Sequence, residues 1–338
     1  VEERAFPFAL HYFTGSKEHN TALRSRAKAR GMKLNEYGLF PAGGEDSLDC
    51  ASEEEIFAAL ELRPVPPELR EDRGELDAAE TDTLPDLVER DDLRGVLHCH
   101  SNWSDGAATI AEMAEAARAR GYGYLGLCDH SQAAAYAGGL DAARVREQHA
   151  EIDRLNADLD GAFRVLKGIE VDILPDGTLD FPDDVLASFD LVVASVHSRF
   201  GLSEEDQTAR VLGALDNPYV DILGHPTGRL LLSRDPYALD LQRVVGAAAE
   251  RGVAVEVNAH PQRLDLDWEN LRYGLAHGMK TAIDPDAHDV DGLDVVEYGL
   301  GIARKGGCTA DDVLNAWPLE RLLEHLAARR RDAGAAHG

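Results

Sequence analysis

The sequence predicts an α/β protein whose larger, C-terminal part is a parallel α/β barrel one unit short of eight. Short apolar, β-rich runs alternate with amphipathic helical stretches from Leu93 onward. Residues 64–92, which are rich in proline and acidic side chains, have the composition of a linker that separates this part from a smaller first unit. Side chains that suit metal binding follow the end of nearly every predicted strand.

Composition limits the class of protein. The 338 residues carry 62 acidic and 34 basic side chains, for a formal net charge of −28. This charge fits either an acidic surface adapted to high salt or a protein that avoids polyanions. No apolar run approaches the roughly 18 residues of a membrane helix, so we expect no membrane contact. The four scattered cysteines fit a reducing, cytoplasmic setting. Because Val1 is not a start methionine, we expect a piece of a longer protein.

The first unit, residues 1–63, is predicted to be a small α+β segment. Phe8–Phe13 is predicted as a strand, and Ser16 as the N-cap of a helix that runs to about Arg30. Residues 32–50 fit an irregular β-hairpin, and Ser52–Glu55 fit a capping box that opens a helix through Leu62. The first helix holds the densest basic cluster of the chain, which fits a solvated face or a phosphate-contacting surface: Arg24, Arg26, Lys28, Arg30 and, just after it, Lys33.

A short motif in this unit resembles the palm-to-thumb segment of family X DNA polymerases. Its residues are Tyr12, Phe13, Thr14, Gly15 and Ser16, then Asn20 and Arg24, then 34–37. The resemblance implies that Tyr12, Phe13 and Gly15 lie against the sugar of an incoming nucleotide. It also implies that Asn20 and Arg24 reach the minor groove and the template strand. The family's catalytic aspartates lie upstream of this motif, so the resemblance implies a DNA-contacting thumb and no polymerisation by this chain.

Seven strands and five long helices are predicted in the second part, residues 93–338. The strands are Gly95–His98, Tyr124–Leu127, Val165–Val171, Leu191–Val196, Val220–Leu223, Val253–Val257 and Thr281–Ile283. The helices are Ile110–Arg120, Ala142–Leu159, Glu204–Leu215, Leu239–Arg251 and Trp268–His277. A doubly wound open sheet would show the same alternation. The first strand is not followed by GxGxxG, which disfavours a dinucleotide-binding fold.

Polar residues at the strand ends predict a metal centre, because in barrels the active site forms where the strands end. Six of the thirteen histidines lie there, namely His98, His100, His130, His197, His225 and His288. Asp105, Glu170 and Asp286 add carboxylates. This ligand mixture suits Zn²⁺, Mn²⁺ or Fe²⁺. Nine ligands exceed the needs of one ion, so we expect two or three divalent ions with Asp105 and Glu170 as bridges.

Three further residues are expected to orient the ligands. Asp172 and Asn258 each lie at a predicted strand end and fit an outer layer of the site. Asp129 fits the same position, or an ion pair with an arginine. His98 and His100 are expected to face the site together, because strand side chains alternate, and Cys99 is expected to face away.

This arrangement resembles the PHP family, named for polymerase and histidinol phosphatase. The resemblance rests on His98-x-His100 with Ser104-Asp105-Gly106, Asp129-His130, Glu170, His197, His225-Pro226 and Asp286-x-His288. It implies a distorted barrel of seven βα units and a trinuclear site held by the nine ligands. With the thumb motif upstream, it implies a Mn²⁺-dependent 3′–5′ exonuclease and 3′-phosphatase of DNA repair. The implied partners are gapped or recessed DNA 3′ ends and upstream polymerase domains of the same parent chain.

The predicted chemistry is attack on phosphorus by a metal-bound hydroxide, since paired divalent ions can lower the pKa of a shared water to about 7. Three arginines near strand ends are candidate phosphate contacts, each of which fits a structural ion pair equally well: Arg199, Arg229 and Arg263. Two alternatives remain, a small-molecule phosphatase of the histidinol-phosphatase type and a catalytically silent structural domain.

Overall fold

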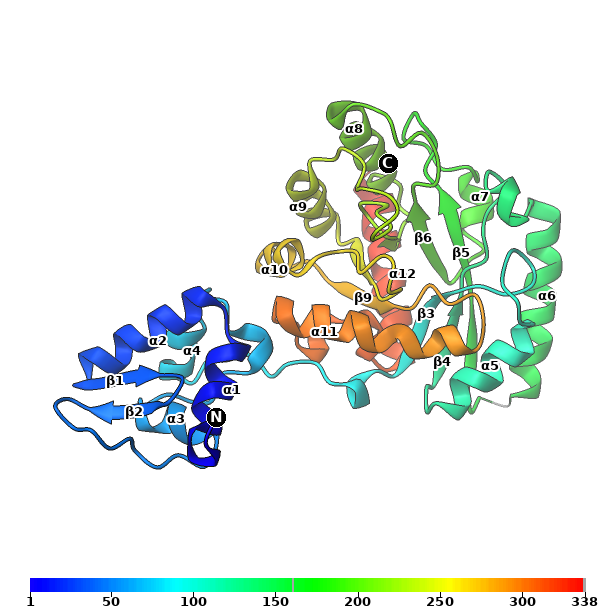
Figure 1. Cartoon of the computed structure of the whole chain (residues 1–338). Coiled ribbons are helices and arrows are strands. Elements are labelled where there is room, and N and C mark those ends of the chain that lie inside the picture. Colours follow the sequence, from blue (N-terminus) through cyan, green and yellow to red (C-terminus); the bar gives the residue numbers. More distant parts are fainter. Residues whose placement is uncertain (160, 337–338) are drawn as a thin grey trace. The chain divides into compact units, whose positions relative to one another are not determined.

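The structure is a computed structural model that describes residues 1–159 and 161–336. The chain divides into two compact units, Val1–Asp86 and the residues from Leu87 onward. The first unit contains four helices and a two-stranded antiparallel sheet (Figure 1): α1 (Phe6–Thr14), α2 (Lys17–Ala29), β1 (Met32–Asn35), β2 (Gly38–Pro41), α3 (Glu53–Ala59) and α4 (Glu75–Thr81). Short 3₁₀ turns lie at Glu3–Ala5 and Pro67–Leu69. The predicted hairpin is confirmed, with Met32 paired to Pro41.

The predicted strand Phe8–Phe13 is wrong, because these residues belong to helix α1. Pro7 lies in the first turn of this helix, where its missing N–H group is not needed. Burial follows the helical period: Phe8 and His11 are buried, whereas Leu10 is 42% and Phe13 is 76% exposed. A strand would have placed Phe8 and Leu10 on the same face.

The two predicted helix caps have different outcomes. Ser16 is the N-cap of α2, and its side chain accepts a hydrogen bond from the backbone N–H of His19 at 3.0 Å. The capping box at Ser52 is absent, since the Ser52 side chain makes no cap bond. Glu55 accepts from the backbone N–H of Ala51 at 2.7 Å instead.

The predicted linker differs from the structure, in which residues 64–86 belong to the first unit. They include α4 and the 3₁₀ turn at Pro67–Leu69, and Val65, Leu69 and Ala79 are buried. The Arg70 guanidinium is buried too and donates to the Val65 carbonyl at 3.0 Å. The proline-rich, acidic composition of residues 64–86 therefore suggested a linker, although this segment is folded.

The second unit is a parallel sheet of seven strands that hydrogen-bond in chain order. They are β3 (Gly95–Cys99), β4 (Tyr124–Leu127), β5 (Arg164–Asp172), β6 (Leu191–Ser195), β7 (Ile222–Leu223), β8 (Ala254–Asn258) and β9 (Thr281–Asp284). The helices surround the strands (Figure 1): α5 (Ile110–Ala119), α6 (Ala142–Asp158), α7 (Asp183–Leu186), α8 (Glu204–Leu215), α9 (Leu241–Arg251), α10 (Trp268–Ala276), α11 (Val296–Gly306) and α12 (Leu319–Ala336). All seven predicted strands and all five predicted helices are confirmed.

Strands β3 and β9 close the sheet into a distorted barrel. A parallel bridge joins Cys99 to Ala287, and the backbone N–H of His100 donates to the Ala287 carbonyl at 2.8 Å. Nearer the strand starts, Asn315 spans the same seam. Its Oδ1 accepts from the Ile283 N–H at 3.0 Å, and its Nδ2 donates to the carbonyls of Ile283 at 2.9 Å and Gly95 at 3.3 Å. The Asn315 side chain, together with a backbone bridge from Val313 to Thr281 and a bond from the Arg94 N–H to the Asn315 carbonyl, thus joins β3 and β9 at this level.

The barrel interior is filled with apolar side chains at the end where the strands start. Tyr124, the first residue of β4, donates its hydroxyl to the Trp317 carbonyl at 2.9 Å. Trp317, Leu322 and Leu326 pack against the inward residues of the strands and close this end. The opposite end, where the strands finish, carries the polar residues and positions the site.

We predict that Asn315→Ala lowers the free energy of unfolding by about 3 kcal/mol, because it leaves buried backbone groups of β3 and β9 unpaired. Urea denaturation followed by circular dichroism measures this loss. Asn217→Ala removes two side-chain bonds near the surface, one that Nδ2 donates to Asp183 and one that Oδ1 accepts from the Tyr219 N–H, and serves as the matched control, with an expected change below about 1 kcal/mol. Equal stability of the two variants would contradict the proposed sealing of the seam by Asn315.

Candidate metal centre

The carboxylate of Glu170, on β5, lies at the centre of the nine predicted ligands. It is 1% exposed and is surrounded by imidazoles from four other strand ends. Oε1 lies 2.9 Å from His225 Nε2, 3.2 Å from His197 Nε2 and 3.3 Å from His98 Nε2; Oε2 lies 3.0 Å from His130 Nδ1 and 3.8 Å from His100 Nε2. The two oxygens of one carboxylate thus face different histidines, as a bridging ligand requires.

Asp105 and Asp286 lie near the ends of β3 and β9 and contact His288 together with three of the histidines that surround Glu170. Asp105 lies 3.4 Å from His288 Nε2 and 3.5 Å from His130 Nε2. Asp286 Oδ1 lies 3.1 Å from His100 Nε2 and 3.7 Å from His98 Nε2. The structure therefore brings all nine predicted ligands to one place.

The donor atoms fall into three groups, each within 4.8 Å, that could hold an ion: His100, Asp105, His130 and His288; His98, His100 and Asp286; and His130, Glu170 and His197. Several buried imidazole nitrogens in these groups have no hydrogen-bond partner among the described residues, including His98 Nε2 and His100 Nδ1. Buried polar atoms are rarely left unpaired. Nitrogen lone pairs beside carboxylates fit coordination of borderline divalent ions.

A β-bulge and unusual backbone conformations aim several ligands at the centre. The register of β3 with β4 shifts between Val96 and Cys99, and His98 has a φ of +50°. Leu97 packs in the barrel interior, whereas Cys99 packs in the outer core. The predicted outward position of Cys99 is therefore confirmed, and His98 and His100 both reach Asp286. Backbone in this left-handed region clusters at functional sites.

Two of the three predicted supporting residues contact ligands. Asp172 Oδ2 lies 3.4 Å from His197 Nδ1, and Asn258 Nδ2 donates to Asp286 Oδ2 at 3.1 Å. Asp129 instead accepts from the N–H of Ser101 at 2.9 Å, the hydroxyl of Ser104 at 2.5 Å and Gln148 Nε2 at 2.6 Å. Asp129 thus braces the loop that leads to Asp105, which fits the outer position expected for it, and the contacts described for it are to serines and a glutamine rather than to an arginine.

Glu256, on β8, is a supporting residue that the sequence analysis missed. It is fully buried and accepts from His98 Nδ1 and from the backbone N–H of His225, the latter at 2.6 Å. Such a bond fixes the imidazole tautomer so that Nε2 faces the ion. The available signal was a single carboxylate within an otherwise apolar strand. Burial and the nearby Glu256 carboxylate raise the pKa of Asp284 well above its ordinary value.

The charges of the site shift several pKa values. Burial acts to lower the pKa of His130, but the Glu170 and Asp105 carboxylates outweigh it and raise the pKa to about 10. The same balance, with Glu170 and Asp172, raises the pKa of His197 to about 9. Burial lowers the pKa of His100 to about 4. In the metal-free protein at pH 7, the site therefore contains both charged and neutral imidazoles.

The three predicted phosphate contacts are placed differently from one another. Arg263 lies at the site, with Nε 3.4 Å from Asp286 Oδ2 and a buried Nη1 that has no partner among the described residues. Arg199 is exposed two residues after His197. Arg229 donates its Nε to the Arg263 carbonyl at 2.7 Å, so part of its guanidinium supports the neighbouring loop.

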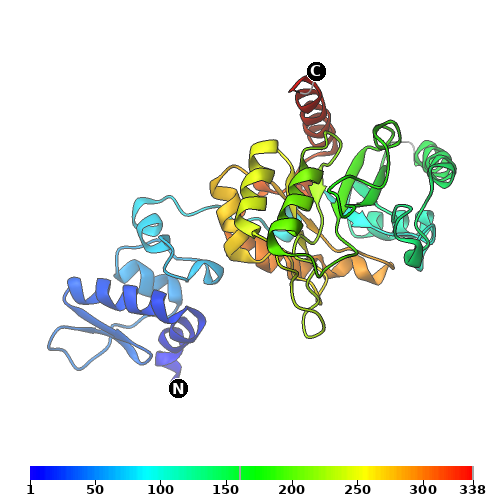
Figure 2. The same cartoon turned by 90° about the horizontal axis from the view of Figure 1, so that it is seen from above.

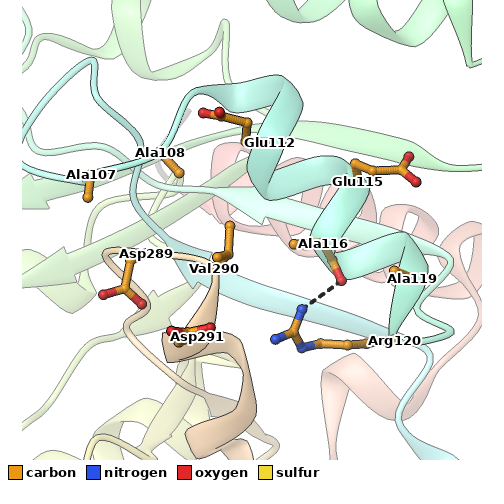
Figure 3. Close-up of a pocket in the computed structure, with 10 residues that line it drawn as sticks. All are labelled: Ala107, Ala108, Glu112, Glu115, Ala116, Ala119, Arg120, Asp289, Val290 and Asp291. Atoms are coloured by element: carbon orange, nitrogen blue, oxygen red, sulfur yellow. Dashed lines mark hydrogen bonds between the residues drawn. The ribbon is translucent and has the colours of Figure 1, made fainter.

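Beside the metal centre, an open cleft lies between α5 and the segment after β9 (Figure 3). Acidic side chains dominate its charged lining: Glu112, Glu115, Asp289 and Asp291, with the single cation Arg120. The Arg120 guanidinium pairs with Asp294 at 2.7 Å. This cleft is unsuited to phosphate because its negative side chains repel it. A nucleic acid is therefore expected to approach the site from another side.

The predicted DNA-contacting residues of the first unit have mixed positions. Phe13 is 76% exposed beside the half-buried Tyr12, and Arg24 is exposed. Asn20 is buried, and its Nδ2 donates to the carbonyls of Tyr12, Gly15 and Ser16 at 2.8–3.2 Å. A Cβ at Gly15 would lie 2.9 Å from the His19 ring, so the bend allows only glycine. Asn20 and Gly15 thus shape the bend after α1.

The basic cluster on α2 is partly neutralised within the unit. Arg26 donates to the Leu60 carbonyl at 2.9 Å and pairs with Glu80 at 3.0 Å. Arg30 pairs with Glu61 at 3.0 Å. Arg24 and Lys28 are exposed, so the surface available to phosphate is smaller than the sequence suggested.

We predict that Glu256→Gln weakens divalent metal binding about 10–100-fold, since it weakens the bond that orients His98 while keeping the shape of the side chain. Metal titration of chelator-treated protein measures this effect. Glu204→Gln, in the exposed first turn of α8, is the control and should bind metal like the parent chain. Unchanged affinity in Glu256→Gln would show that the bond to His98 does not support the ligand.

We predict that metal binding at pH 7 releases at least two protons, because the pKa of His130 is raised to about 10, that of His197 to about 9 and that of His98 well above its ordinary value, and these imidazoles must lose their protons to coordinate. The raised pKa values also stabilise the metal-free fold fully below pH about 6.5, and this contribution is lost as pH rises through about 9–10. Calorimetry in two buffers of different ionisation enthalpy measures the release. A binding heat independent of buffer would contradict it.

Comparisons with known proteins agree with this geometry. The family description DNA polymerase beta thumb matches residues 9–71, and PHP domain matches residues 97–260. "DNA polymerase/3′-5′ exonuclease PolX" of Bacillus subtilis is 45% identical over 320 residues, which cover 95% of this chain and 56% of that relative. The chain thus spans just over half the length of this relative.

A second relative is matched over almost its whole length. A "Probable phosphatase" of Syntrophotalea carbinolica is 32% identical over 246 residues, which cover 68% of this chain and 94% of that protein. The crystal structure of histidinol phosphate phosphatase from Lactococcus lactis matches 72% of this chain and 94% of its own, with 17% identity and a TM-score of 0.44. The chain belongs to the PHP family and carries, ahead of its PHP domain, a thumb of the family X DNA polymerases.

Proposed function

We propose that this chain is a metal-dependent phosphoesterase that acts on DNA 3′ ends, as a 3′–5′ exonuclease and 3′-phosphatase. The observation that carries the proposal is the presence, in one chain, of nine clustered candidate ligands and a polymerase-type thumb. The Bacillus subtilis relative is named as a polymerase and 3′–5′ exonuclease, and shorter relatives are named as probable phosphatases. Phosphoester hydrolysis is common to both names.

The nine ligands would hold two or three divalent ions, with Mn²⁺ or Zn²⁺ favoured and Fe²⁺ suitable. Glu170, beside the histidines after β6 and β7, and Asp105, beside His130 and His288, are the two carboxylates that would be shared between ions. Bound divalent ions supply a Lewis acid and an activated water at neutral pH. The burial of Glu170 and of most of the histidines lowers the local dielectric and strengthens each of these interactions.

The chain's own residues would position the scissile phosphate. Arg263 is held at the rim by Asp286, and its Nη1, which has no partner among the described residues, would turn toward a phosphate oxygen. Arg199, exposed next to the β6 end, offers a second cation. Arg229 would act mainly through the loop that carries Arg263, since it donates to the Arg263 carbonyl.

The first unit would bind the DNA. Exposed Phe13 and Arg24, with Tyr12, offer an aromatic surface and a cation to the sugar-phosphate backbone. Asn20 and Gly15 would keep these side chains in place. Polymerase domains of a longer parent chain are the proposed covalent partners. None of the helices in residues 1–159 and 161–336 is long and apolar enough to span a bilayer. The four free cysteines fit the proposed cytoplasmic location.

Two other functions are less well supported. A small-molecule phosphatase of the histidinol-phosphatase type would use the same metal centre, but it has no need of a thumb. A catalytically silent domain would tolerate loss of ligands, yet every ligand position here holds a suitable side chain.

We predict that His98→Ala/His100→Ala reduces Mn²⁺-dependent release of nucleotides from a 3′-recessed duplex by at least about 10³-fold, because both imidazoles are ligand candidates. Circular dichroism of the variant checks that the barrel remains folded. His277→Ala, at the exposed end of α10, is the matched control and should retain full activity. Retained nuclease activity in the double variant would contradict the assigned metal centre.

The substrate class is tested by comparing turnover of a 3′-recessed duplex, a 3′-phosphorylated duplex and histidinol phosphate by the same preparation. The DNA substrates should be preferred, since the thumb adds contacts only to them. A clear preference for the small ester would support the histidinol-phosphatase alternative, and absence of turnover for all three would support the silent domain.

A further inference from the structure

We propose that the loop between β7 and α9 carries an apolar wedge, Leu231 and Leu232, that separates the terminal base pair of duplex DNA so that the 3′ nucleotide can enter the metal centre. This inference rests on the proposed function and adds a residue pair that determines which DNA ends are used. The loop, yellow-green in Figure 2, protrudes from the second unit.

The two leucines expose apolar side chains to solvent, which is unfavourable for a residue without a binding partner. Leu231 is 38% exposed and Leu232 is fully exposed. Four large hydrophobic residues are strongly exposed among the described residues of this unit: Tyr136, Leu231, Leu232 and Tyr298. Three of them lie on loops after β4 and β7, at the end of the barrel where the metal ligands lie. Exposed apolar groups gathered beside a site indicate a binding surface.

Backbone hydrogen bonds fix the wedge in this exposed position. Leu230 and Arg234 exchange two bonds of 2.8 and 2.7 Å across the loop, and Leu231 donates its N–H to the Gln262 carbonyl at 2.5 Å. Leu232 has a φ of +64°, a conformation that a leucine seldom adopts without support. The loop is therefore held in shape with its leucines in solvent.

Arginines surround the base of the wedge. Arg234 donates to the Gly228 carbonyl at 2.9 Å, and its guanidinium lies 4.3 Å from the centre of the Phe200 ring. Arg229 joins this loop to the one that carries Arg263. With Arg199, four arginines thus occupy the connected loops after β6, β7 and β8. Phosphates supply most of the affinity for DNA, and arginine clusters bind them.

The side of the site next to β3 and β9 repels DNA. The cleft beside β3 and β9 is lined by Glu112, Glu115, Asp289 and Asp291, which repel phosphate (Figure 3). Since the arginines follow β6 to β8, the duplex is expected to lie over these strands. Leu231 and Leu232, on the loop after β7, then lie on the same side of the barrel as the duplex.

The depth of the centre explains why a wedge is needed. Seven of the nine ligand side chains are at most 10% exposed, and only Asp105 and His288 are more open. A 3′ nucleotide that has left the stack can reach such a site more easily than one held in the duplex, where the partner strand adds bulk. Leucine is among the side chains that proteins insert between base steps to unstack them.

The test compares the parent chain with Leu231→Ser/Leu232→Ser on three oligonucleotides of the same sequence: a single strand, a blunt duplex and a duplex with a mismatched 3′ terminal pair. Mn²⁺-dependent cleavage of the single strand should change less than about 2-fold, whereas cleavage of the blunt duplex should fall at least about 10-fold, and the mismatch should restore most of the loss. Tyr298→Ser, an exposed apolar residue on α11, is the control and should cleave all three like the parent. Equal loss on all three substrates, or no loss on the blunt duplex, would overturn the wedge.

A second measurement separates this inference from the proposed function. A blunt duplex with 2-aminopurine at the 3′ end and a phosphorothioate at the last linkage reports unstacking by a rise in fluorescence, without requiring hydrolysis. The rise should occur with the parent chain and be lost in the double leucine variant. If the parent chain unstacks the base but cleaves none of the substrates, the wedge stands and the proposed function fails. If cleavage occurs without the fluorescence rise, the function stands and the wedge fails.

Discussion

The ionised carboxylate of Glu170, buried among histidines, is the interaction on which the rest of the structure depends. Four imidazole nitrogens lie within 3.3 Å of its oxygens. One belongs to His98 in β3, and the other three belong to histidines that follow β4, β6 and β7. Burial acts to raise the pKa of Glu170, but the surrounding imidazoles lower it well below its ordinary value. The negative charge must therefore be balanced by protons on histidines or by cations. Losing either would leave a buried, uncompensated charge.

Closing seven strands into one ring brings those histidines to Glu170. Asp286 and His288 follow β9 and lie next to the end of β3, where the His100 N–H donates to the Ala287 carbonyl and keeps the two segments in register. Asn315 seals the seam deeper in the barrel, where no eighth strand pairs among the described residues. The apolar layer around Trp317 fills the far end, so the polar side chains are concentrated at the other end. The apolar packing that stabilises the barrel and the polar candidate site thus lie at opposite ends of the barrel.

The barrel and the candidate ligands could be predicted from the sequence because buried parallel strands appear as apolar runs. A polar residue within or directly after such a run, such as Glu170 or His197, is then easy to recognise. The sequence could not predict Glu256, since its partner His98 is 158 residues away. It misassigned Phe8–Phe13 because an aromatic-rich run fits both a helix and a strand until its packing partners are known. The wedge was equally hidden, because two leucines in sequence look like core and only the fold shows Leu232 in solvent.

The unusual backbone of three ligands has a geometric cause. Strand side chains alternate between the inside and the outside of a barrel, so a regular strand cannot aim adjacent residues at one centre. Leu97 and His98 both point inward, which the bulge and the positive φ of His98 permit. His225 and Asp286 also have positive φ at their strand ends. Each such conformation costs about 1–3 kcal/mol, which the supporting bonds of Glu256 and Asn258 offset in part. The fold therefore gives up local stability at the strand ends to place its ligands around Glu170.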